Sequence, residues 1–263
     1  MLSAVIALGS IGIIFGAILA GASKVFAVET DPKLDELIEA LPGANCGACG
    51  YPGCSGFAEG VLKGEAPVDG CPVGKKKVAN ELADIIGKTD MEAASDTPMV
   101  AKVKCHGTSE VAKDKFRYEG VKDCKAAMLI DGGPKACSYG CMGLGTCERI
   151  CPFDAIVMGD NGLPIIDQEL CTGCKKCVVA CPKDVIGMIP QGSDVHVMCN
   201  SNDKAKKVMQ VCKVGCIGCS KCAKACPKDC IKMEDGLAKI DNTICISCGI
   251  CVKECPTHAI EQL

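Results

Sequence analysis

One cysteine pattern constrains the fold of this chain, because it dictates where metal-binding loops must lie. The pattern C-x2-C-x2-C-x3-C-P runs from Cys216 to Pro227 and is repeated from Cys245 to Pro256. With this spacing, three thiolates bind one iron–sulfur cubane, and the fourth cysteine, which precedes the proline, binds the other. The sequence therefore predicts two [4Fe–4S] sites with crossed ligands. The ligands are Cys216, Cys219, Cys222 and Cys255 for one site, and Cys245, Cys248, Cys251 and Cys226 for the other.

Residues 213–263 resemble bacterial-type ferredoxins with two [4Fe–4S] clusters, and this resemblance implies electron transfer. Between the two halves, apolar and polar residues alternate around Asp235-Gly236, which is a signal for a two-residue hairpin. Tandem zinc knuckles are the alternative, but zinc is satisfied by four ligands and does not require the repeated third cysteine. The spacing from Cys212 to Cys219 also matches the radical-SAM triplet, but no run of strand–helix units long enough for a barrel surrounds it.

A second copy of the pattern lies upstream, at 136–190, and marks an internal repeat. Its latter half is regular, whereas its first half reads Cys137-x3-Cys141-x5-Cys147-x3-Cys151-Pro152. The crossed-ligand rule predicts one site from Cys137, Cys141, Cys147 and Cys181, and another from Cys171, Cys174, Cys177 and Cys151. The enlarged spacing at Cys137 leaves a three-iron or altered site as an alternative.

A further motif near the N-terminus predicts a small domain with a single cluster. Asp31 and Pro32 predict the start of a helix, and the following Cys46–Cys54 stretch reads C-x2-C-x4-C, with glycine and proline in its turns. A helix over Ser55–Lys63 and a return loop are expected to bring the fourth ligand. The predicted ligands are Cys46, Cys49, Cys54 and Cys71, and a structural zinc site is the alternative.

The stretch L-P-G-A-N-C-G-A-C-G-Y-P-G-C-S-G-F-A, followed by G-C-P, resembles the single-cluster domain of the B-subunit family of Rnf electron-transport complexes. A similar domain occurs in the corrinoid-protein subunit of acetyl-CoA decarbonylase/synthase, but a hydrophobic N-terminus ahead of the domain favours Rnf. The resemblance covers the whole chain. It implies an α+β protein with an N-terminal transmembrane helix, a single-[4Fe–4S] domain and two bacterial-type ferredoxin modules.

Five cysteines lie outside these motifs. Cys230 is expected to be a buried structural thiol, because Ala155 holds its place in the other copy. The other four flank the first copy, two on each side, so its ends could bring them together around a sixth cluster. These four are Cys105, Cys124, Cys199 and Cys212, and ordinary buried thiols are the alternative.

The first 23 residues carry no charged side chain, and Leu2–Ala22 is long enough to cross a ~30 Å hydrocarbon core as a helix. The sequence therefore predicts a single-pass membrane anchor. Lys24, together with the reduced thiols that metal binding requires, places the rest of the chain on the cytoplasmic side. A cleaved signal peptide is the alternative, supported by Ala20-Gly21-Ala22 and opposed by the missing basic n-region.

Composition indicates a chain that depends on metal for its folding, because aromatic residues make up only 3% of it and 25 residues are cysteine. The formal net charge of −3 does not favour a nucleic-acid partner. The expected divisions are 1–23 transmembrane helix, 30–90 single-cluster domain, 91–135 linker or extension, 136–190 first ferredoxin copy, 191–212 connecting segment and 213–263 second ferredoxin copy.

The resulting hypothesis is a membrane-anchored redox subunit that relays single electrons through five or six [4Fe–4S] clusters and has no complete catalytic site of its own. The resemblance implies reduced ferredoxin as donor and other membrane subunits of an ion-translocating complex as partners. Lys221 and Lys224 lie inside a cluster motif, in a segment, 204–228, without Asp or Glu, so an acidic ferredoxin is expected to dock there. A solvated lysine-rich face is the alternative for these lysines. The alternative function is a soluble polyferredoxin-type carrier for a dehydrogenase.

Overall fold

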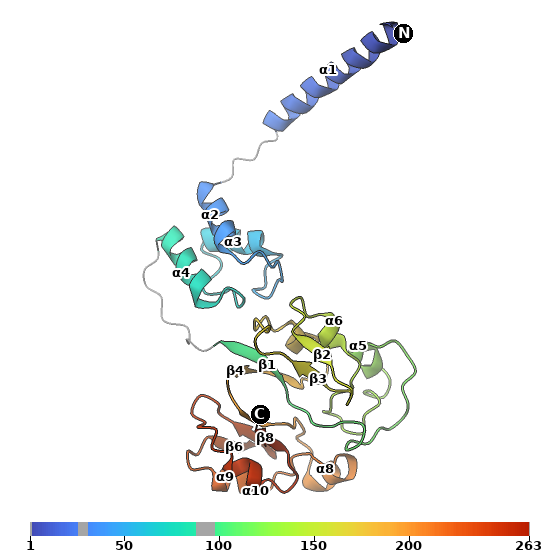
Figure 1. Ribbon diagram of the computed structural model, residues 1–263, viewed down its shortest axis with the longest axis vertical. Helices are drawn as coiled ribbons and strands as arrows, with labels where there is room; N and C mark the ends of the chain where they lie inside the picture. Colours follow the sequence, from blue (N-terminus) through green and yellow to red (C-terminus); the bar gives the residue numbers. More distant parts are fainter. Residues whose placement is uncertain (1, 26–30, 88–97, 263) are drawn as a thin grey trace.

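The computed structural model describes residues 2–25, 31–87 and 98–262 (Figure 1). Helix α1 comprises Leu2–Val25, where the sequence predicts a membrane anchor. Within the described residues, however, no helix combines the length and the apolarity that a membrane span requires, so the predicted transmembrane helix is not confirmed. The predicted linker falls partly on residues 88–97, which lie outside the described residues.

The next unit consists of three helices: α2 (Pro32–Ala40), α3 (Cys54–Leu62) and α4 (Lys75–Ile86). The predicted start of α2 is confirmed, because the Asp31 carboxylate accepts a hydrogen bond from the Lys33 N–H and Pro32 is the first helical residue. The core of the three-helix unit contains Leu37, Phe57 and Leu82, all of which are buried. These apolar contacts hold the Cys-rich loop between α2 and α3 on one side of the unit.

Two modules of the same plan follow, and each combines an outer antiparallel strand pair with an inner hairpin. In module 1 (99–190) the outer pair is β1 (Met99–Val103) with β4 (Ile186–Pro190), and the hairpin is β2 (Ile156–Met158) with β3 (Pro164–Ile166). In module 2 (195–262) the outer pair is β5 (Val195–Val197) with β8 (Ile260–Gln262), and the hairpin is β6 (Ile231–Glu234) with β7 (Leu237–Ile240). The hairpin predicted around Asp235-Gly236 is thus confirmed.

Short helices carry the cysteine motifs in both modules. Module 1 has α5 (Cys124–Met128), α6 (Thr146–Arg149) and α7 (Lys176–Ala180), and module 2 has α8 (Ala205–Val211), α9 (Lys221–Ala225) and α10 (Ile250–Glu254). Four of them begin after a residue in the left-handed conformation. These residues are Gly145, Lys175, Ser220 and Gly249. This conformation lets the loop before each helix curl around a common centre.

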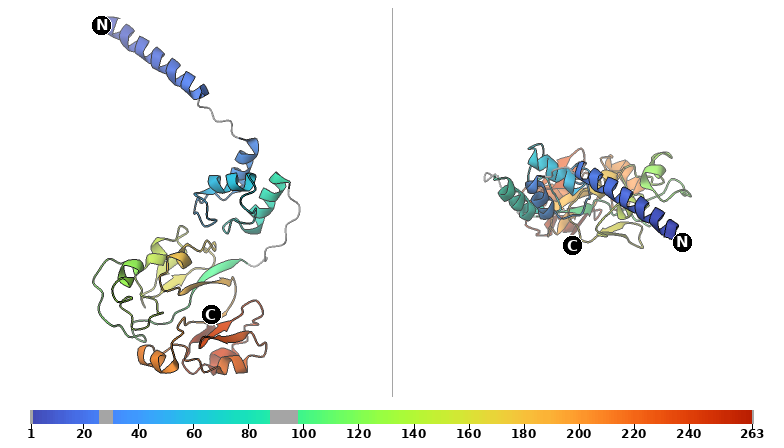
Figure 2. Two further views of the ribbon diagram at one scale, coloured as in Figure 1. Left: turned by 180° about the vertical axis from the view of Figure 1, so that it is seen from behind. Right: turned by 90° about the horizontal axis from the view of Figure 1, so that it is seen from above.

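The part of the predicted linker or extension that the structure describes is built into the fold. Strand β1 pairs with β4. The segment that follows β1 packs against module 2, where the Lys113 N–H donates to Val211 O at 2.9 Å. The Lys213 N–H in turn donates to Val111 O at 2.9 Å. The expected connecting segment, 191–212, contributes β5 and α8 to module 2. Module 1 consequently lies between the α2–α4 unit and module 2 (Figures 1 and 2).

Candidate metal centres

Cysteine side chains ring five hollows in the two modules. All 25 cysteines of the chain are free thiols. Among the residues that the structure describes, no three His, Cys, Asp or Glu side chains are placed to hold one metal ion. Instead, each hollow is lined by four or five cysteines and otherwise largely by apolar residues and glycines. Four thiolates around a space larger than one ion are the donor set that a [4Fe–4S] cluster uses, so the residues fit this group.

Module 2 brings together both ligand sets that its sequence predicts. The Cys216 hollow, about 320 Å³, is lined by Cys216, Cys219, Cys222 and Cys255. The Cys245 hollow, also about 320 Å³, is lined by Cys245, Cys248, Cys251 and Cys226. The cysteine before each proline thus contributes to the hollow of the opposite motif. Cys230 also lines the Cys245 hollow, and its Sγ lies 3.3 Å from Cys226 Sγ.

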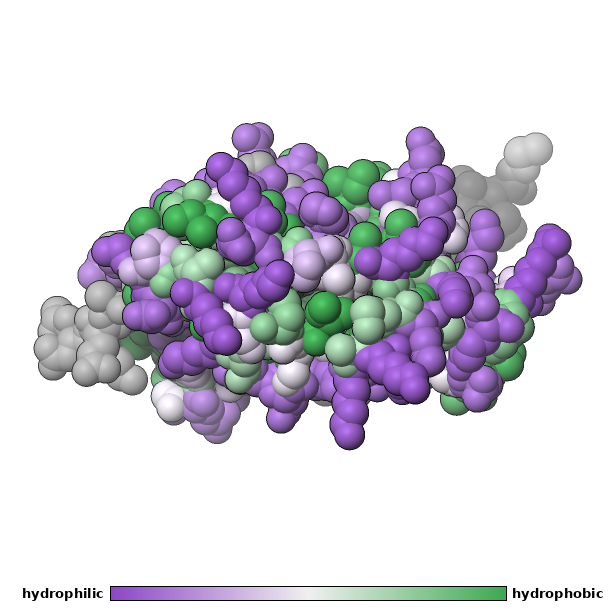
Figure 3. Space-filling model, turned by 90° about the horizontal axis from the view of Figure 1, so that it is seen from below, coloured by the Kyte–Doolittle hydropathy of each residue, from purple (hydrophilic) through white to green (hydrophobic). Residues whose placement is uncertain are grey.

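Two cysteines of module 2, Cys219 and Cys248, are exposed. The basic segment around Cys219 is exposed as well, including Lys221 and Lys224 of α9. Figure 3 shows that this end of the molecule, seen from below, is largely hydrophilic, with long polar side chains projecting from it. Another lysine of the segment, Lys207, has an ion-pair partner in Asp203, 2.9 Å away.

One of the two predicted sets in module 1 is also brought together. The Cys171 hollow is lined by Cys151, Cys171, Cys174 and Cys177. A hydrogen bond from the Ala101 N–H of β1 reaches Cys171 Sγ at 3.4 Å. Burial, with smaller contributions from the adjacent Cys171 and Cys174 thiols, raises the pKa of the Cys177 thiol to about 12. Such thiols release protons when they bind metal, so metal binding here is coupled to pH.

The structure does not bring the other predicted set in module 1 together as the sequence groups it. The Cys141 hollow, about 400 Å³, is lined by Cys124, Cys141, Cys147 and Cys181, and Cys137 does not line it. Cys137 instead faces a different space, the Cys105 hollow of about 480 Å³. That space is lined by Cys105, Cys137, Cys141, Cys199 and Cys212. Cys124 and Cys137 have therefore exchanged the places that the sequence assigned to them.

The reason for this exchange is a missing cysteine in an otherwise regular loop. Gly143 and Gly218 both have positive φ, +71° and +67°, and a Cβ on either would lie 2.5 or 2.7 Å from the carbonyl oxygen of the hairpin glycine, Gly162 or Gly236. Gly143 and Gly218 therefore hold equivalent positions in the two loops. In this register Cys141 and Cys147 match Cys216 and Cys222, and Leu144 stands where module 2 has Cys219. The loop is not stretched; it lacks its second thiol.

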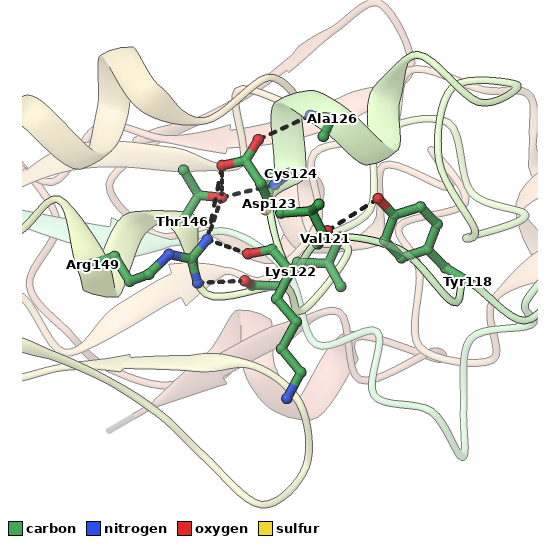
Figure 4. A network of polar contacts seen from close by, with 9 residues as sticks. Tyr118, Val121, Lys122, Asp123, Cys124, Ala126, Thr146 and Arg149 are labelled. Atoms are coloured by element: carbon green, nitrogen blue, oxygen red, sulfur yellow. Dashed lines mark hydrogen bonds and ion pairs between the residues drawn. The ribbon is translucent and has the colours of Figure 1, made fainter.

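A polar network brings Cys124 to the position of the missing ligand (Figure 4). Asp123 caps α5 by accepting a hydrogen bond from the Ala126 N–H at 2.9 Å, and it also accepts one from the Thr146 hydroxyl at 3.0 Å. The same hydroxyl accepts the Cys124 N–H at 2.7 Å. Arg149 donates to the carbonyl oxygens of Leu144, at 3.0 Å, and Lys122. Helix α5 is thereby fixed against α6, with Cys124 beside Cys141 and Cys147.

The interaction between these three thiols is visible in their electrostatics. Burial raises the pKa of Cys141 to about 12, and the Cys105, Cys147 and Cys124 thiols all contribute to the rise. Burial also raises the pKa of Cys147 to about 11, and Cys124 is the largest of the neighbouring charges that add to it. Sequence spacing alone missed Cys124, although aligning Cys141 with Cys216 would have revealed the gap at Leu144.

In the α2–α4 unit, Cys49, Cys54 and Cys71 pack against one apolar core. The Cys54 N–H donates to the Asn45 amide oxygen at 2.8 Å, and the Gly74 N–H donates to Cys71 Sγ at 3.4 Å. Burial raises the pKa of Cys71, with smaller contributions from the Cys49 and Cys54 thiols. The fourth predicted ligand, Cys46, lies close enough to Cys174 of module 1 to act on its pKa, which burial mainly raises.

Three protein-family models match segments of the chain. The family described as "Putative Fe-S cluster" matches residues 41–73, the 4Fe-4S binding domain matches residues 164–187, and the 4Fe-4S dicluster domain matches residues 215–259. These segments correspond to the α2–α4 unit, the second half of module 1 and the cysteine-bearing part of module 2. The chain thus contains iron–sulfur domains of the ferredoxin type.

Curated relatives match almost the whole chain. It is 50% identical over 234 residues to the B subunit of the Na(+)-translocating ferredoxin:NAD(+) oxidoreductase complex of Acetobacterium woodii, a match that covers 89% of this chain and 69% of the relative. It is 48% identical to the proton-translocating counterpart of Clostridium ljungdahlii, over 89% of this chain and 82% of the relative. It is 41% identical to the B subunit of the ion-translocating oxidoreductase complex of Methanosarcina acetivorans, over 92% of this chain and 90% of the relative. The chain therefore belongs to the B-subunit family of ion-translocating oxidoreductase complexes, the iron–sulfur electron-transfer subunits of these redox assemblies.

Proposed function

We propose that this chain accepts single electrons from reduced ferredoxin and passes them to partner redox subunits of a membrane-bound, ion-translocating complex. The observation that carries the proposal is the series of cysteine-lined hollows along the molecule. [4Fe–4S] clusters supply one-electron chemistry without making or breaking bonds in a substrate. The names of the Acetobacterium and Clostridium relatives, which specify ferredoxin and NAD(+), support this donor and this overall reaction.

The proposed ligands follow the cysteines that line each hollow. In module 2 they are the two crossed sets predicted from the sequence. In module 1 they are the Cys171 set and the Cys141 set, the latter with Cys124. In the α2–α4 unit they are Cys46, Cys49, Cys54 and Cys71. These five sites are the minimum, and the residues of each one arrive from at least two separate turns of the chain.

Electrostatic interactions between cysteines of different sites support an order for the relay. Cys177 of the Cys171 hollow lies within electrostatic reach of Cys147 of the Cys141 hollow. Cys174 of the same hollow lies within reach of Cys46. Electrons that enter module 2 would therefore cross module 1 and leave through the α2–α4 unit. That unit is the one next to α1 in the sequence, so it is the proposed exit toward membrane partners.

Exposure and charge support module 2 as the entry point. Cys219 is the exposed ligand of the Cys216 hollow, and the exposed Lys221 and Lys224 follow it directly. An acidic ferredoxin that docks on these lysines would bring its own cluster close to Cys219. Opposite charges speed such encounters, and salt screens the effect.

Attachment of the chain to the membrane through α1 is part of the proposal. Its support is the uncharged sequence of residues 1–23 and the exposed apolar side chains of Ile13, Phe15 and Leu19. The single-pass topology with the cluster domains on the cytoplasmic side stays a prediction.

The docking proposal is tested by charge reversal. Lys221→Glu with Lys224→Glu should slow reduction by ferredoxin about tenfold or more at low salt and much less at high salt, because electrostatic steering changes association rates by 10-fold to ~1000-fold. Stopped-flow absorbance of the clusters measures the rate. Lys33→Glu with Lys75→Glu, the same charge change on the α2–α4 unit, is the matched control. Equal rates for the module 2 variant and the control at low salt would refute this docking site.

A further inference from the structure

The Cys105 hollow lies between the two modules and belongs to neither ferredoxin motif. It has a volume of about 480 Å³, the largest of the five cysteine-lined hollows in the two modules. Residues from the segment of module 1 between β1 and Cys141 and from the segment between β5 and Cys216 line it together. The His106 N–H donates to Met198 O at 3.2 Å, which ties these two segments together at one edge.

The four cysteines that only this hollow uses form two equivalent pairs. Strand β1 ends at Val103 and β5 ends at Val197, and a cysteine follows two residues later in each case. The second member of each pair lies four residues before the first cysteine of a ferredoxin motif, with a glycine directly before that cysteine. The pairs are Cys105 with Cys137 in module 1, and Cys199 with Cys212 in module 2. The internal repeat thus places the same two thiols in each module.

Backbone hydrogen bonds to the sulfur atoms repeat in the same way. Cys105 Sγ accepts the N–H groups of Gly107 and Cys141, both at 3.4 Å. Cys199 Sγ accepts the N–H groups of Ser201 and Cys216. In both modules, therefore, the donors are the residue two positions further on and the first cysteine of the motif. Paired N–H donors stabilise a thiolate, which is the form that binds iron.

Cys137 is the thiol that links the other three. Burial, with smaller contributions from the Cys216 and Cys137 thiols, raises the pKa of Cys199 to about 11. Burial also raises the pKa of Cys105 and of Cys212, and Cys137 adds to the rise at both positions. Cys105 and Cys199 are both half-buried. Cys137 therefore lies near all three partners, with which it lines the same hollow.

We propose that Cys105, Cys137, Cys199 and Cys212 hold a sixth [4Fe–4S] cluster, which connects module 2 to module 1. The proposal rests on the proposed function, because it assumes that the chain is an iron–sulfur protein. It differs from the grouping expected from the sequence by replacing Cys124 with Cys137. Two thiols from each module make the site dependent on both modules being docked.

This site lies between the Cys216 hollow of module 2 and the Cys141 hollow of module 1, and so connects the two modules in the proposed relay. Its Cys199 contacts Cys216 of the nearest hollow in module 2, and its Cys105 contacts Cys141 of the nearest hollow in module 1. With clusters bound, each electron that passed this way would oxidise the Cys216 site by one electron and reduce the Cys141 site by one electron. No bond forms or breaks and no proton is required.

The grouping is tested by counting iron in paired variants of the full chain, prepared anaerobically. Wild type should contain about 24 iron atoms, four for each of six sites. Cys137→Ala and Cys199→Ala should each remove about four, and the two together should also remove about four, because both act on one site. Cys124→Ala combined with Cys137→Ala should remove about eight, because these two residues serve different sites. Low-temperature EPR of the reduced proteins should show the matching loss of spins.

Two results of the iron count would overturn the proposal. One is an unchanged iron content in Cys199→Ala, and the other is a loss of about eight irons when Cys137 and Cys199 are replaced together. Native mass spectrometry of the wild-type chain provides a measurement that does not depend on variants that fold. A fully loaded mass with six clusters agrees with the proposal, and a maximum of five contradicts it. A five-cluster protein would still satisfy the proposed function, whereas a protein without any cluster would refute both.

Discussion

The backbone N–H of Cys141 donates a hydrogen bond to Cys105 Sγ, 3.4 Å away, and thereby joins two cysteine-lined hollows at a single residue. In module 2, the N–H of Cys216 makes the same bond to Cys199. The first cysteine of each motif thus faces one hollow with its thiol and the neighbouring hollow with its backbone. This arrangement explains why an extra pair of cysteines can be added to each module without disturbing the ferredoxin loops.

The crossed-ligand arrangement predicts which site a single cysteine serves. Cys226→Ala should remove the cluster of the Cys245 hollow and leave the Cys216 hollow loaded, although Cys226 follows the Cys216 motif in the sequence. Cys230 Sγ lies 3.3 Å from Cys226 Sγ and could replace it as ligand, so the variant is made in a Cys230→Ala background. Iron content and EPR are the measurements, and Cys230→Ala alone is the control with its full iron content. Loss confined to the Cys216 cluster would contradict crossing.

The network around Arg149 predicts a site-specific weakness. Arg149→Leu should release α5 and Cys124 from α6, and should destabilise the protein by about 1.5–3 kcal/mol, the usual range for a hydrogen bond to a charged group. The Cys141 site should then lose its iron to a chelator faster than the others do. Arg117→Leu is the matched control, because Arg117 forms an exposed ion pair with Glu119, its one polar contact among the described residues. Chelation at the same rate in both variants would show that the network does not position Cys124.

Two glycines with the same backbone conformation should respond differently to alanine. Gly218 and Gly236 both have positive φ, +67° and +81°, but a Cβ on Gly218 would lie 2.7 Å from Gly236 O, whereas a Cβ on Gly236 meets no atom within 4 Å. Gly236→Ala should therefore cost about 1–2 kcal/mol from the left-handed conformation alone. Gly218→Ala should cost clearly more and reduce loading of the Cys216 site. Denaturation monitored by loss of cluster absorbance compares the two. Equal stabilities of Gly218→Ala and Gly236→Ala would mean that the Cys216 loop can move away from Gly236 O without loss of stability, which would contradict the prediction.

The proposed membrane attachment is tested by truncation. A chain that begins after Ser23 should appear in the soluble fraction with its full iron content, whereas the complete chain should sediment with membranes. Both chains are expressed without partner subunits, so that only α1 differs between them. A soluble complete chain would favour the alternative of a soluble carrier, and a membrane-bound truncated chain would place the attachment elsewhere.

Regular cysteine spacing was sufficient to predict three groups of four cysteines that the structure brings together in the modules. It was sufficient because each thiol lies at a fixed place in a short loop, and local turns determine where it points. The hairpin at Asp235-Gly236 and the start of α2 at Asp31-Pro32 were predictable for the same reason.

The exchange of Cys124 and Cys137 was not predictable from spacing, because it depends on contacts between distant segments. Cys124 reaches Cys141 only through the Asp123–Thr146 hydrogen bond and the contacts of Arg149. The docking of the segment between β1 and Cys141 onto module 2 likewise depends on long-range hydrogen bonds, such as the one from the Lys113 N–H to Val211 O. Neither the exchange nor the docking has a local sequence signal. A comparison of the two repeats would have indicated that Cys105 and Cys199 hold equivalent positions and that Leu144 replaces a cysteine.

The central claim is that reduced ferredoxin fills a chain of clusters in this protein, and an anaerobic titration of the purified full-length chain tests it most directly. Reduced ferredoxin is added stepwise while the visible absorbance and the EPR spin count are recorded. The account predicts a brown protein that bleaches on addition of ferredoxin and develops [4Fe–4S] spin signals, with several electrons taken up per chain. A colourless protein, or a loaded protein whose clusters stay oxidised in the presence of excess reduced ferredoxin, would contradict it.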